Sequence, residues 1–144
     1  MDTQTKRIEA YCHHKAIRLT RLRKKIIRFL ASQTKPLKAY ELLAKLNHEQ
    51  DDKVYVIMSI YRILDFLCQH HIVHRINSNN SYILCCHPGK NSCQIFICNT
   101  CGKKIEFHDQ VLHQALTKLA TKSHFTIQQQ AIELSGVCQY CLAA

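Results

Sequence analysis

Two Cys-x-x-Cys pairs, Cys98/Cys101 and Cys138/Cys141, constrain this chain more than any other feature. Each pair places two thiols on one tight turn, and two such turns brought together give the four-sulfur tetrahedron of a structural zinc site. The alternative is four buried or redox-active cysteines. The 36 residues between the pairs (102–137) exceed the length of a simple zinc ribbon. We therefore predict a zinc site that encloses secondary structure and ties the C-terminal end to the middle of the chain.

Length and cysteine content limit the class of protein. The chain has 144 residues and nine cysteines, an odd number that argues against complete disulfide pairing. Residues 1–6 are polar and lack the apolar core of a signal peptide, and no stretch approaches the roughly 18 apolar residues of a membrane span. We expect a soluble, cytoplasmic protein of one ordinary or two small domains, whose cysteines bind metal.

Positive charge is concentrated near the N-terminus. The formal net charge is +10, and residues 15–35 contain eight Lys or Arg and no acidic residue. Such a block suits a polyanion such as DNA, RNA or an acidic membrane, although a solvated helix face is a common alternative. Arg21, Lys24 and Lys25 are the candidates for contacts with a nucleic-acid backbone.

Hydrophobic periodicity divides the chain into two domains joined by a hinge. Helices are expected at 5–14, 21–32, 38–47 and 53–70, followed by a hairpin of strands 72–76 and 81–86. This order is typical of a winged helix-turn-helix, which we assign to residues 1–87. After a linker at 88–93, strands at 94–98, 103–107 and 125–134 and a helix at 109–121 predict a small α/β domain at 94–144. The expected fold class is α+β.

A second metal site is predicted in the hairpin. If the turn is Asn79-Asn80, His74 lies opposite Cys85 and Ile72 lies opposite His87, so both histidines and Cys85 share one sheet face. These donors suit zinc. Glu106 could add a carboxylate from the second domain, and Cys93, in the linker, competes with His87 for the remaining position. The alternative is a half-buried His and Cys on a sheet face.

Five short motifs are spread over nearly the whole chain. They are Arg18-Leu19-Thr20, Ala39-Tyr40-Glu41-Leu42-Leu43, Ile60-Tyr61-Arg62-Ile63-Leu64-Asp65-Phe66-Leu67, Asn80-Ser81-Tyr82-Ile83-Leu84-Cys85, and Phe96-Ile97-Cys98-x-x-Cys101-Gly102 with Glu106. Together they resemble the ferric uptake regulator family. The segment that ends in Cys85 favours the zinc branch of that family over its iron branch. A reduced histidine run before the first knuckle also weakens an iron- or peroxide-sensing interpretation.

The resemblance implies a homodimeric, zinc-responsive repressor of zinc-uptake genes that binds operator DNA, with two zinc ions per chain and no enzymatic activity. The structural zinc would be held by the four knuckle cysteines. The regulatory zinc would be held by His74, Cys85 and Glu106, and its fourth ligand stays open between His87 and Cys93. DNA contacts are implied for Tyr40 and Arg62, and the recognition helix adds Ser59 and Tyr61 as candidates.

Other classes of function fit less well. The zinc deaminase pattern requires His-x-Glu and Pro-Cys-x-x-Cys, and neither occurs in the sequence. A thiol oxidoreductase would use one Cys-x-x-Cys near a βαβ unit, whereas here there are two such pairs outside one. The remaining alternatives are an iron- or peroxide-sensing member of the same family and a zinc-ribbon scaffold protein that binds nucleic acid.

Overall fold

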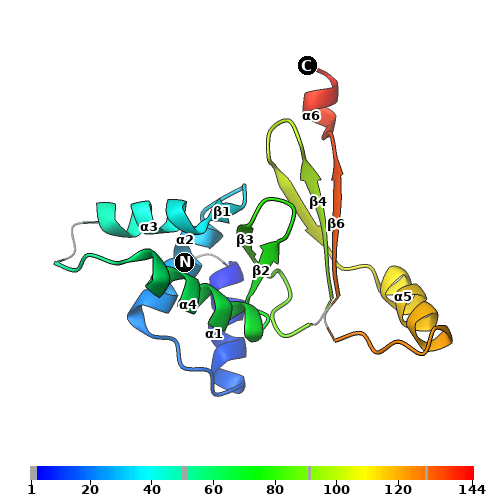
Figure 1. Ribbon diagram of the computed structural model, residues 1–144, viewed down its shortest axis with the longest axis horizontal. Coiled ribbons are helices and arrows are strands. Elements are labelled where there is room, and N and C mark those ends of the chain that lie inside the picture. Colours follow the sequence, from blue (N-terminus) through cyan, green and yellow to red (C-terminus); the bar gives the residue numbers. More distant parts are fainter. Residues whose placement is uncertain (1–2, 50–51, 91, 129) are drawn as a thin grey trace. The chain divides into compact units, whose positions relative to one another are not determined.

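The computed structural model describes residues 3–49, 52–90, 92–128 and 130–144 (Figure 1). The chain divides into two compact units, residues 1–89 and 90–144, so the division falls inside the segment 88–93 that the sequence marks as a hinge. Each unit combines helices with a three-stranded sheet. The α+β class is therefore confirmed.

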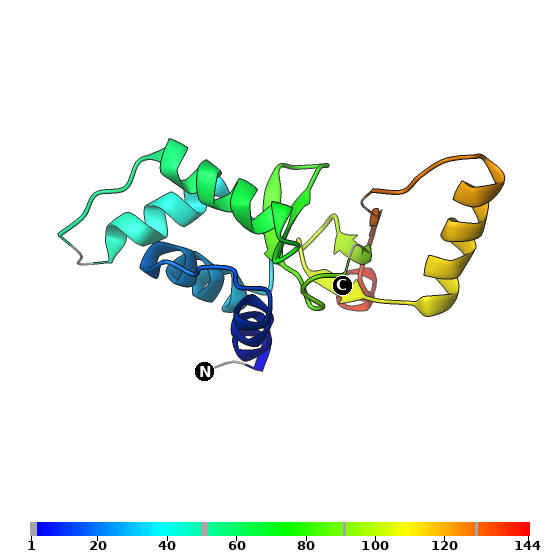
Figure 2. The same ribbon diagram turned by 90° about the horizontal axis from the view of Figure 1, so that it is seen from below.

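Unit 1 (residues 1–89) begins with helices α1 (Thr3–His14), α2 (Arg21–Ala31), α3 (Ala39–His48) and α4 (Ile57–Gln69). Thr20 caps α2 by accepting a hydrogen bond from the backbone N–H of Arg23. Figure 2 shows α3 and α4 running side by side. Helix α4 was expected from Lys53 but begins four residues later.

A side chain of α3 explains the late start of α4. The amide of Asn47 donates to the carbonyl of Tyr55 at 3.1 Å and accepts from the backbone N–H of Tyr55 at 2.8 Å. This double hydrogen bond satisfies both backbone groups of Tyr55 outside a helix, and Val56 follows in an extended conformation. The segment before α4 is therefore held extended.

The wing is a three-stranded sheet in the order β1-β3-β2, built from β1 (Leu37–Lys38), β2 (Val73–Ile76) and β3 (Ser81–Leu84). The predicted two-residue turn is wrong. His74 pairs with Ile83 and Ile76 with Ser81, which leaves a four-residue loop at 77–80. Asn79 accepts from the backbone N–H of Ser81, and Asn80 adopts a positive φ of 52°, so the asparagines close a longer loop than expected.

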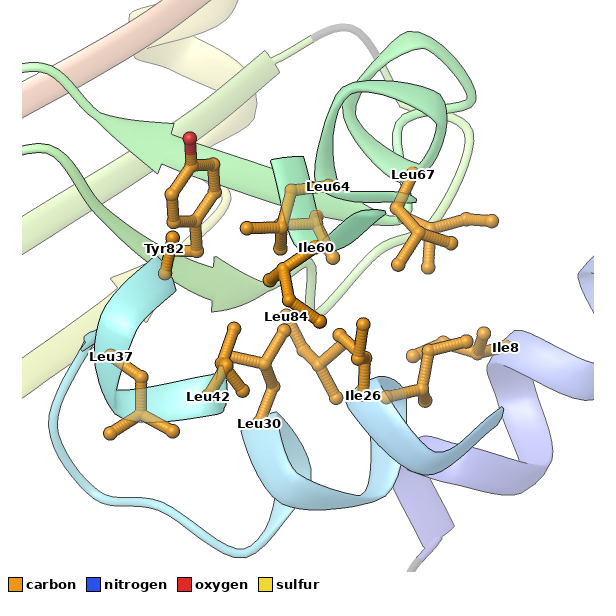
Figure 3. Packing of buried hydrophobic residues seen from close by; sticks show 14 of the residues in the cluster. Ile8, Ile26, Leu30, Leu37, Leu42, Ile60, Leu64, Leu67, Tyr82 and Leu84 are labelled. Carbon is orange, nitrogen blue, oxygen red and sulfur yellow. The ribbon is translucent and has the colours of Figure 1, made fainter. Parts of the chain in front are cut away.

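One apolar core holds unit 1 together. Helices α1 to α4 contribute one face each, and β3 supplies Tyr82 and Leu84, as the labelled side chains in Figure 3 show. The helical spacing of Ile60, Leu64 and Leu67 in the sequence predicts one apolar stripe on α4, and all three side chains are completely buried in this core. Burial of one such side chain stabilises the fold by roughly 1.5–3 kcal/mol.

Unit 2 (residues 90–144) contains β4 (Ser92–Cys98), β5 (Lys104–Phe107), α5 (Gln110–Lys122), β6 (Gln130–Gly136) and the short α6 (Gln139–Leu142). Its sheet has the order β5-β4-β6, with β4 and β5 antiparallel and β4 and β6 parallel. A parallel pair needs a crossover, which α5 provides. Cys93 pairs with Ala131 and therefore lies in β4, not in the linker where it was expected.

The third strand of unit 2 was predicted at 125–134, but it begins at Gln130. Its neighbour β4 begins at Ser92, which pairs with Gln130, so the two parallel strands begin side by side. His124 has a positive φ of 53° at the end of α5, which places Phe125 in the connection instead. Helix α6, which the sequence did not predict, begins at the second cysteine knuckle.

Candidate metal centres and nucleic-acid interface

The four knuckle cysteines come together in unit 2. Every pair of their sulfur atoms lies within 4.8 Å, and the Sγ atoms of Cys101 and Cys138 are 3.8 Å apart. Zinc–sulfur bonds of about 2.3 Å in a tetrahedron place the sulfurs about 3.8 Å from one another. The cluster therefore matches the size of a four-thiolate zinc site. It is the only group of three or more potential ligands this compact within the described residues.

Backbone hydrogen bonds shape both knuckles. Gly102 has φ of +74° and donates its N–H to the carbonyl of Cys98 at 2.9 Å, which turns the chain between β4 and β5. Cys138 is the N-cap residue of α6, whose first turn brings Cys141 back toward it. Asn99 donates its backbone N–H to the carbonyl of Gly136 at 2.8 Å. The end of β6 is thus fixed beside the first knuckle.

The electrostatics of the cluster favour a cation. Backbone N–H groups, first that of Cys101 and then that of Cys138, lower the pKa of Cys98 to about 6. A hydrogen bond from the backbone of Cys141 likewise lowers the pKa of Cys138, whereas Cys141, which donates its S–H toward Cys138, has its pKa raised to about 12. Cys98 and Cys138 are thus held closer to the thiolate form in which cysteine ligates zinc, and a zinc ion would displace the proton that Cys141 keeps.

The wing contains the His–Cys pair that the sequence predicts. His74 Nε2 lies 3.1 Å from the sulfur of Cys85, and both side chains are buried, with 2% and 1% exposed. The two residues are diagonal neighbours and not directly opposite, because the register differs from the predicted one by two residues. A shift of two preserves the sheet face, so the prediction that they share a face holds despite the wrong turn.

His87 occupies a different environment from the one expected. Its carbonyl accepts a hydrogen bond from the thiol of Cys85 at 3.2 Å, while its ring Nδ1 lies 3.0 Å from the sulfur of Cys86. His87 follows the end of β3, so no strand pairing fixes its ring on the face of His74.

The two candidate ligands of unit 2, Cys93 and Glu106, share one face of its sheet. Glu106 pairs with Ile95 of β4, and Cys93 lies two residues before Ile95 on the same strand. The side chain of Glu106 is 8% exposed, and its Oε1 lies 3.3 Å from the Nζ of Lys104. Cys93 is 2% exposed. A sheltered carboxylate and a buried thiol are thus available on this face.

The candidate DNA-contacting residues lie on α2, α3 and α4. Tyr40, the second residue of α3, is 66% exposed, and Arg62 is exposed on the outer side of α4. Ser59 and Tyr61 are half-buried on the same helix, and Arg21 and Lys24 are exposed on α2. Lys25 differs, because its Nζ pairs with Glu49 at 2.8 Å and only 14% of its side chain is exposed.

The sequence reasoning missed a basic residue with a structural role. The guanidinium of Arg23 stacks over the ring of Phe66 at 3.5 Å and donates to the carbonyl of Arg18 at 2.7 Å. This contact joins α2 to α4. Not every cation of the basic block therefore faces outward, and the spacing of Lys and Arg within the block does not predict which one packs against α4.

Comparison with known proteins agrees with this architecture. The model of the ferric uptake regulator family matches residues 14–135. The chain belongs to this family. It is 31% identical over 136 residues to the zinc uptake regulation protein of Escherichia coli (strain K12), covering 93% of this chain and 78% of that protein.

Solved structures of family members have the same fold. A crystal structure of holo XcZur matches with a TM-score of 0.84 at 34% identity, covering 97% of each chain. A zinc uptake regulator complexed with zinc and DNA matches with a TM-score of 0.86 at 29% identity, covering 99% of this chain and 97% of the other. Within the described residues, no helix has the length and apolar character to cross a membrane.

Proposed function

We propose that this member of the ferric uptake regulator family is a zinc-responsive transcriptional repressor. It binds double-stranded operator DNA as a homodimer when its regulatory site holds zinc, and it controls zinc-uptake genes in the cytoplasm. It performs no catalysis. The observation that carries the proposal is the buried His74–Cys85 pair in the wing, because one imidazole and one thiol select zinc over the hard cations. The relatives named as zinc uptake regulators support the same branch.

The four knuckle cysteines would hold a structural zinc. Within the described residues, the apolar residues of unit 2 that are buried as whole residues all belong to one strand, β4: Cys93, Ile95, Ile97 and Cys98. A unit with so small a core needs help from a metal or from association. A zinc ion with four protein ligands would cross-link the two knuckles and would have no open coordination position for a substrate.

His74, Cys85 and Glu106 would hold the regulatory zinc, with His87 or Cys93 as the fourth ligand. Zinc–nitrogen and zinc–sulfur bonds of about 2.0 and 2.3 Å place the two ligand atoms about 3.5 Å apart. The observed 3.1 Å between His74 Nε2 and the Cys85 sulfur is slightly shorter, so the pair would have to open by a few tenths of an ångström to hold the ion. The carbonyl of His87 already orients the thiol of Cys85.

The mechanism rests on ligands from two units. Side chains of unit 1 and unit 2 that share one ion favour the arrangement of the units in which all of them can bind it. DNA binding then rises only to the extent that zinc prefers this arrangement over the others. The fold itself needs no change, since each unit keeps its own sheet.

The recognition helix α4 would read the major groove. Arg62 suits a bidentate contact with guanine, while Tyr40, Ser59 and Tyr61 surround the same interface. Arg21 and Lys24 would contact phosphates, which position the protein without reading sequence. Lys25 contributes less than expected, because Glu49 already neutralises it.

Exposed apolar side chains of unit 2 support a homodimer. Phe96, Ile105 and Leu134 are 45%, 50% and 46% exposed on one face of the sheet, beside a hollow of about 370 Å³. On α5, Val111 is 75% and Leu119 is 60% exposed. Large apolar side chains that gather on one exposed sheet face, as Phe96, Ile105 and Leu134 do, mark a site of association.

The test measures DNA binding against free zinc. The parent chain, Cys85→Ala, His74→Ala and the control Cys68→Ala, another cysteine of unit 1, are titrated with an operator duplex and a scrambled duplex. We expect zinc to tighten operator binding for the parent and the control but not for the other two. If Cys85→Ala and His74→Ala respond to zinc as the parent does, the regulatory site is misplaced.

Two further arms separate the alternatives. A response to iron or peroxide without a response to zinc would identify a different sensor of the same family. Equal binding to both duplexes at every zinc concentration would favour a zinc-ribbon scaffold. Arg62→Ala should lose roughly 1–3 kcal/mol on the operator only, whereas Lys24→Ala should weaken both duplexes alike.

A further inference from the structure

Lys104 and Glu106 form a sheltered ion pair on one face of the unit 2 sheet. Their positions in β5 are two apart, so both side chains project to the same side, together with Ile95 and Cys93 of β4. The Nζ–Oε1 distance is 3.3 Å, and the side chains are only 14% and 8% exposed. Water therefore screens this pair less than it screens an ordinary surface pair.

The partner of Glu106 matters because Glu106 is the carboxylate of the proposed regulatory site. A protonated lysine has three donors and no acceptor, so Lys104 cannot ligate a metal and can only compete for the carboxylate oxygens. If zinc takes the oxygen that Lys104 holds, the ion pair is lost. If the two cations share the carboxylate, a unit charge lies within a few ångströms of a double charge in a poorly screened place. Both routes weaken zinc binding.

We propose that Lys104 sets the zinc threshold of the regulatory site by holding the carboxylate of Glu106 when no zinc is bound. Lys104 supplies the counter-ion that a sheltered carboxylate requires in the metal-free protein, and it raises the free zinc concentration needed to fill the site. The inference rests on the proposed role of Glu106 as a ligand. Lys104 would thus tune the zinc affinity of the regulatory site, although in the sequence it lies beside the first cysteine knuckle.

The test is a zinc titration of the full-length chain against a chromophoric zinc chelator. It reports the affinity of the second, weaker class of zinc and needs no DNA. Lys104→Met removes the charge while retaining most of the length, and Lys104→Arg keeps the charge as the matched control. We expect Lys104→Met to bind the second zinc about tenfold more tightly than the parent, equal to about 1.4 kcal/mol. The affinity of Lys104→Arg for the second zinc should stay within about threefold of that of the parent, since the charge of the side chain is unchanged.

Glu106→Gln separates failure of this inference from failure of the proposed site. If Glu106→Gln binds the second zinc as the parent does, Glu106 is not a ligand and the proposed site is wrong. If Glu106→Gln weakens the second zinc but Lys104→Met leaves it unchanged or weakens it, Glu106 is a ligand and Lys104 does not compete for it. A weaker second zinc in Lys104→Met would mean that Lys104 orients the carboxylate, which also overturns the inference.

The double variant Lys104→Met/Glu106→Gln completes the cycle. We expect it to match Glu106→Gln, because lysine has no effect once the carboxylate for which it competes is gone. A tenfold gain in both backgrounds would show that Lys104 acts through another group and would refute the inference. Lys104→Gln replaces Lys104→Met if circular dichroism shows that the methionine variant does not fold.

Discussion

Replacing Gly89 with alanine should release helix α1 from the end of unit 1. Gly89 has φ of +83°, and a Cβ added there would clash with Cε2 and lie 2.9 Å from Cζ of Tyr11. The hydroxyl of Tyr11 donates to the carbonyl of His70 at 3.1 Å, and the backbone N–H of Gly89 donates to the carbonyl of His71 at 3.3 Å. The backbone at Gly89 thus packs directly against an aromatic ring of α1.

Two effects should destabilise the folded state of Gly89→Ala. A residue with a Cβ in the left-handed region costs about 1–2 kcal/mol. The ring of Tyr11 must also turn aside, which forfeits its hydrogen bond at about 0.5–1.5 kcal/mol. The sum is about 1.5–3.5 kcal/mol, equivalent to an increase of about 12- to 300-fold in the opening equilibrium of α1.

Amide hydrogen exchange of α1 in the zinc-loaded chain measures this opening directly. Gly136→Ala is the matched control, because a Cβ there meets no atom within 4 Å and should leave exchange in α1 unchanged. Tyr11→Phe removes only the hydroxyl and should speed exchange by about fivefold, or about 1 kcal/mol. Equal exchange in Gly89→Ala and Gly136→Ala would refute the steric argument.

Three other predictions concern stability and thiol chemistry. Cys141→Ser should lose one zinc per chain and unfold unit 2, since a structural site contributes on the order of 10 kcal/mol; metal analysis with circular dichroism checks this, and a folded variant with its full zinc content would contradict it. Thr20→Ala should cost about 1 kcal/mol in urea unfolding, while Thr20→Ser, which keeps the capping oxygen, should cost little. Burial raises the pKa of Cys68 to about 11, so its alkylation, followed by mass spectrometry, should be slow at pH 7 and accelerate as the pH rises toward 11; rapid labelling of the folded chain at pH 7 would disprove this.

The sequence by itself determined the long helices of both units and the chemistry of the strongest site. The apolar stripe of α4 predicted its buried face, and the two Cys-x-x-Cys pairs predicted a four-sulfur cluster. Both patterns depend on the spacing of nearby residues. The predictions drawn from them therefore hold even where the predicted ends of helices and strands are wrong by a few residues. The face shared by His74 and Cys85 survived for a related reason, because a register error of two residues returns every side chain to the same side of a sheet.

Only the tertiary structure decided features that depend on contacts between distant residues. Asn47 fixes where α4 begins, and the start of β4 fixes where β6 begins, although neither partner is a sequence neighbour of the element it limits. The basic block likewise divides into exposed cations, Lys25 paired with Glu49, and Arg23 stacked on Phe66. Composition counts charges, but the packing of α2 against its neighbours determines which of them remain available to DNA.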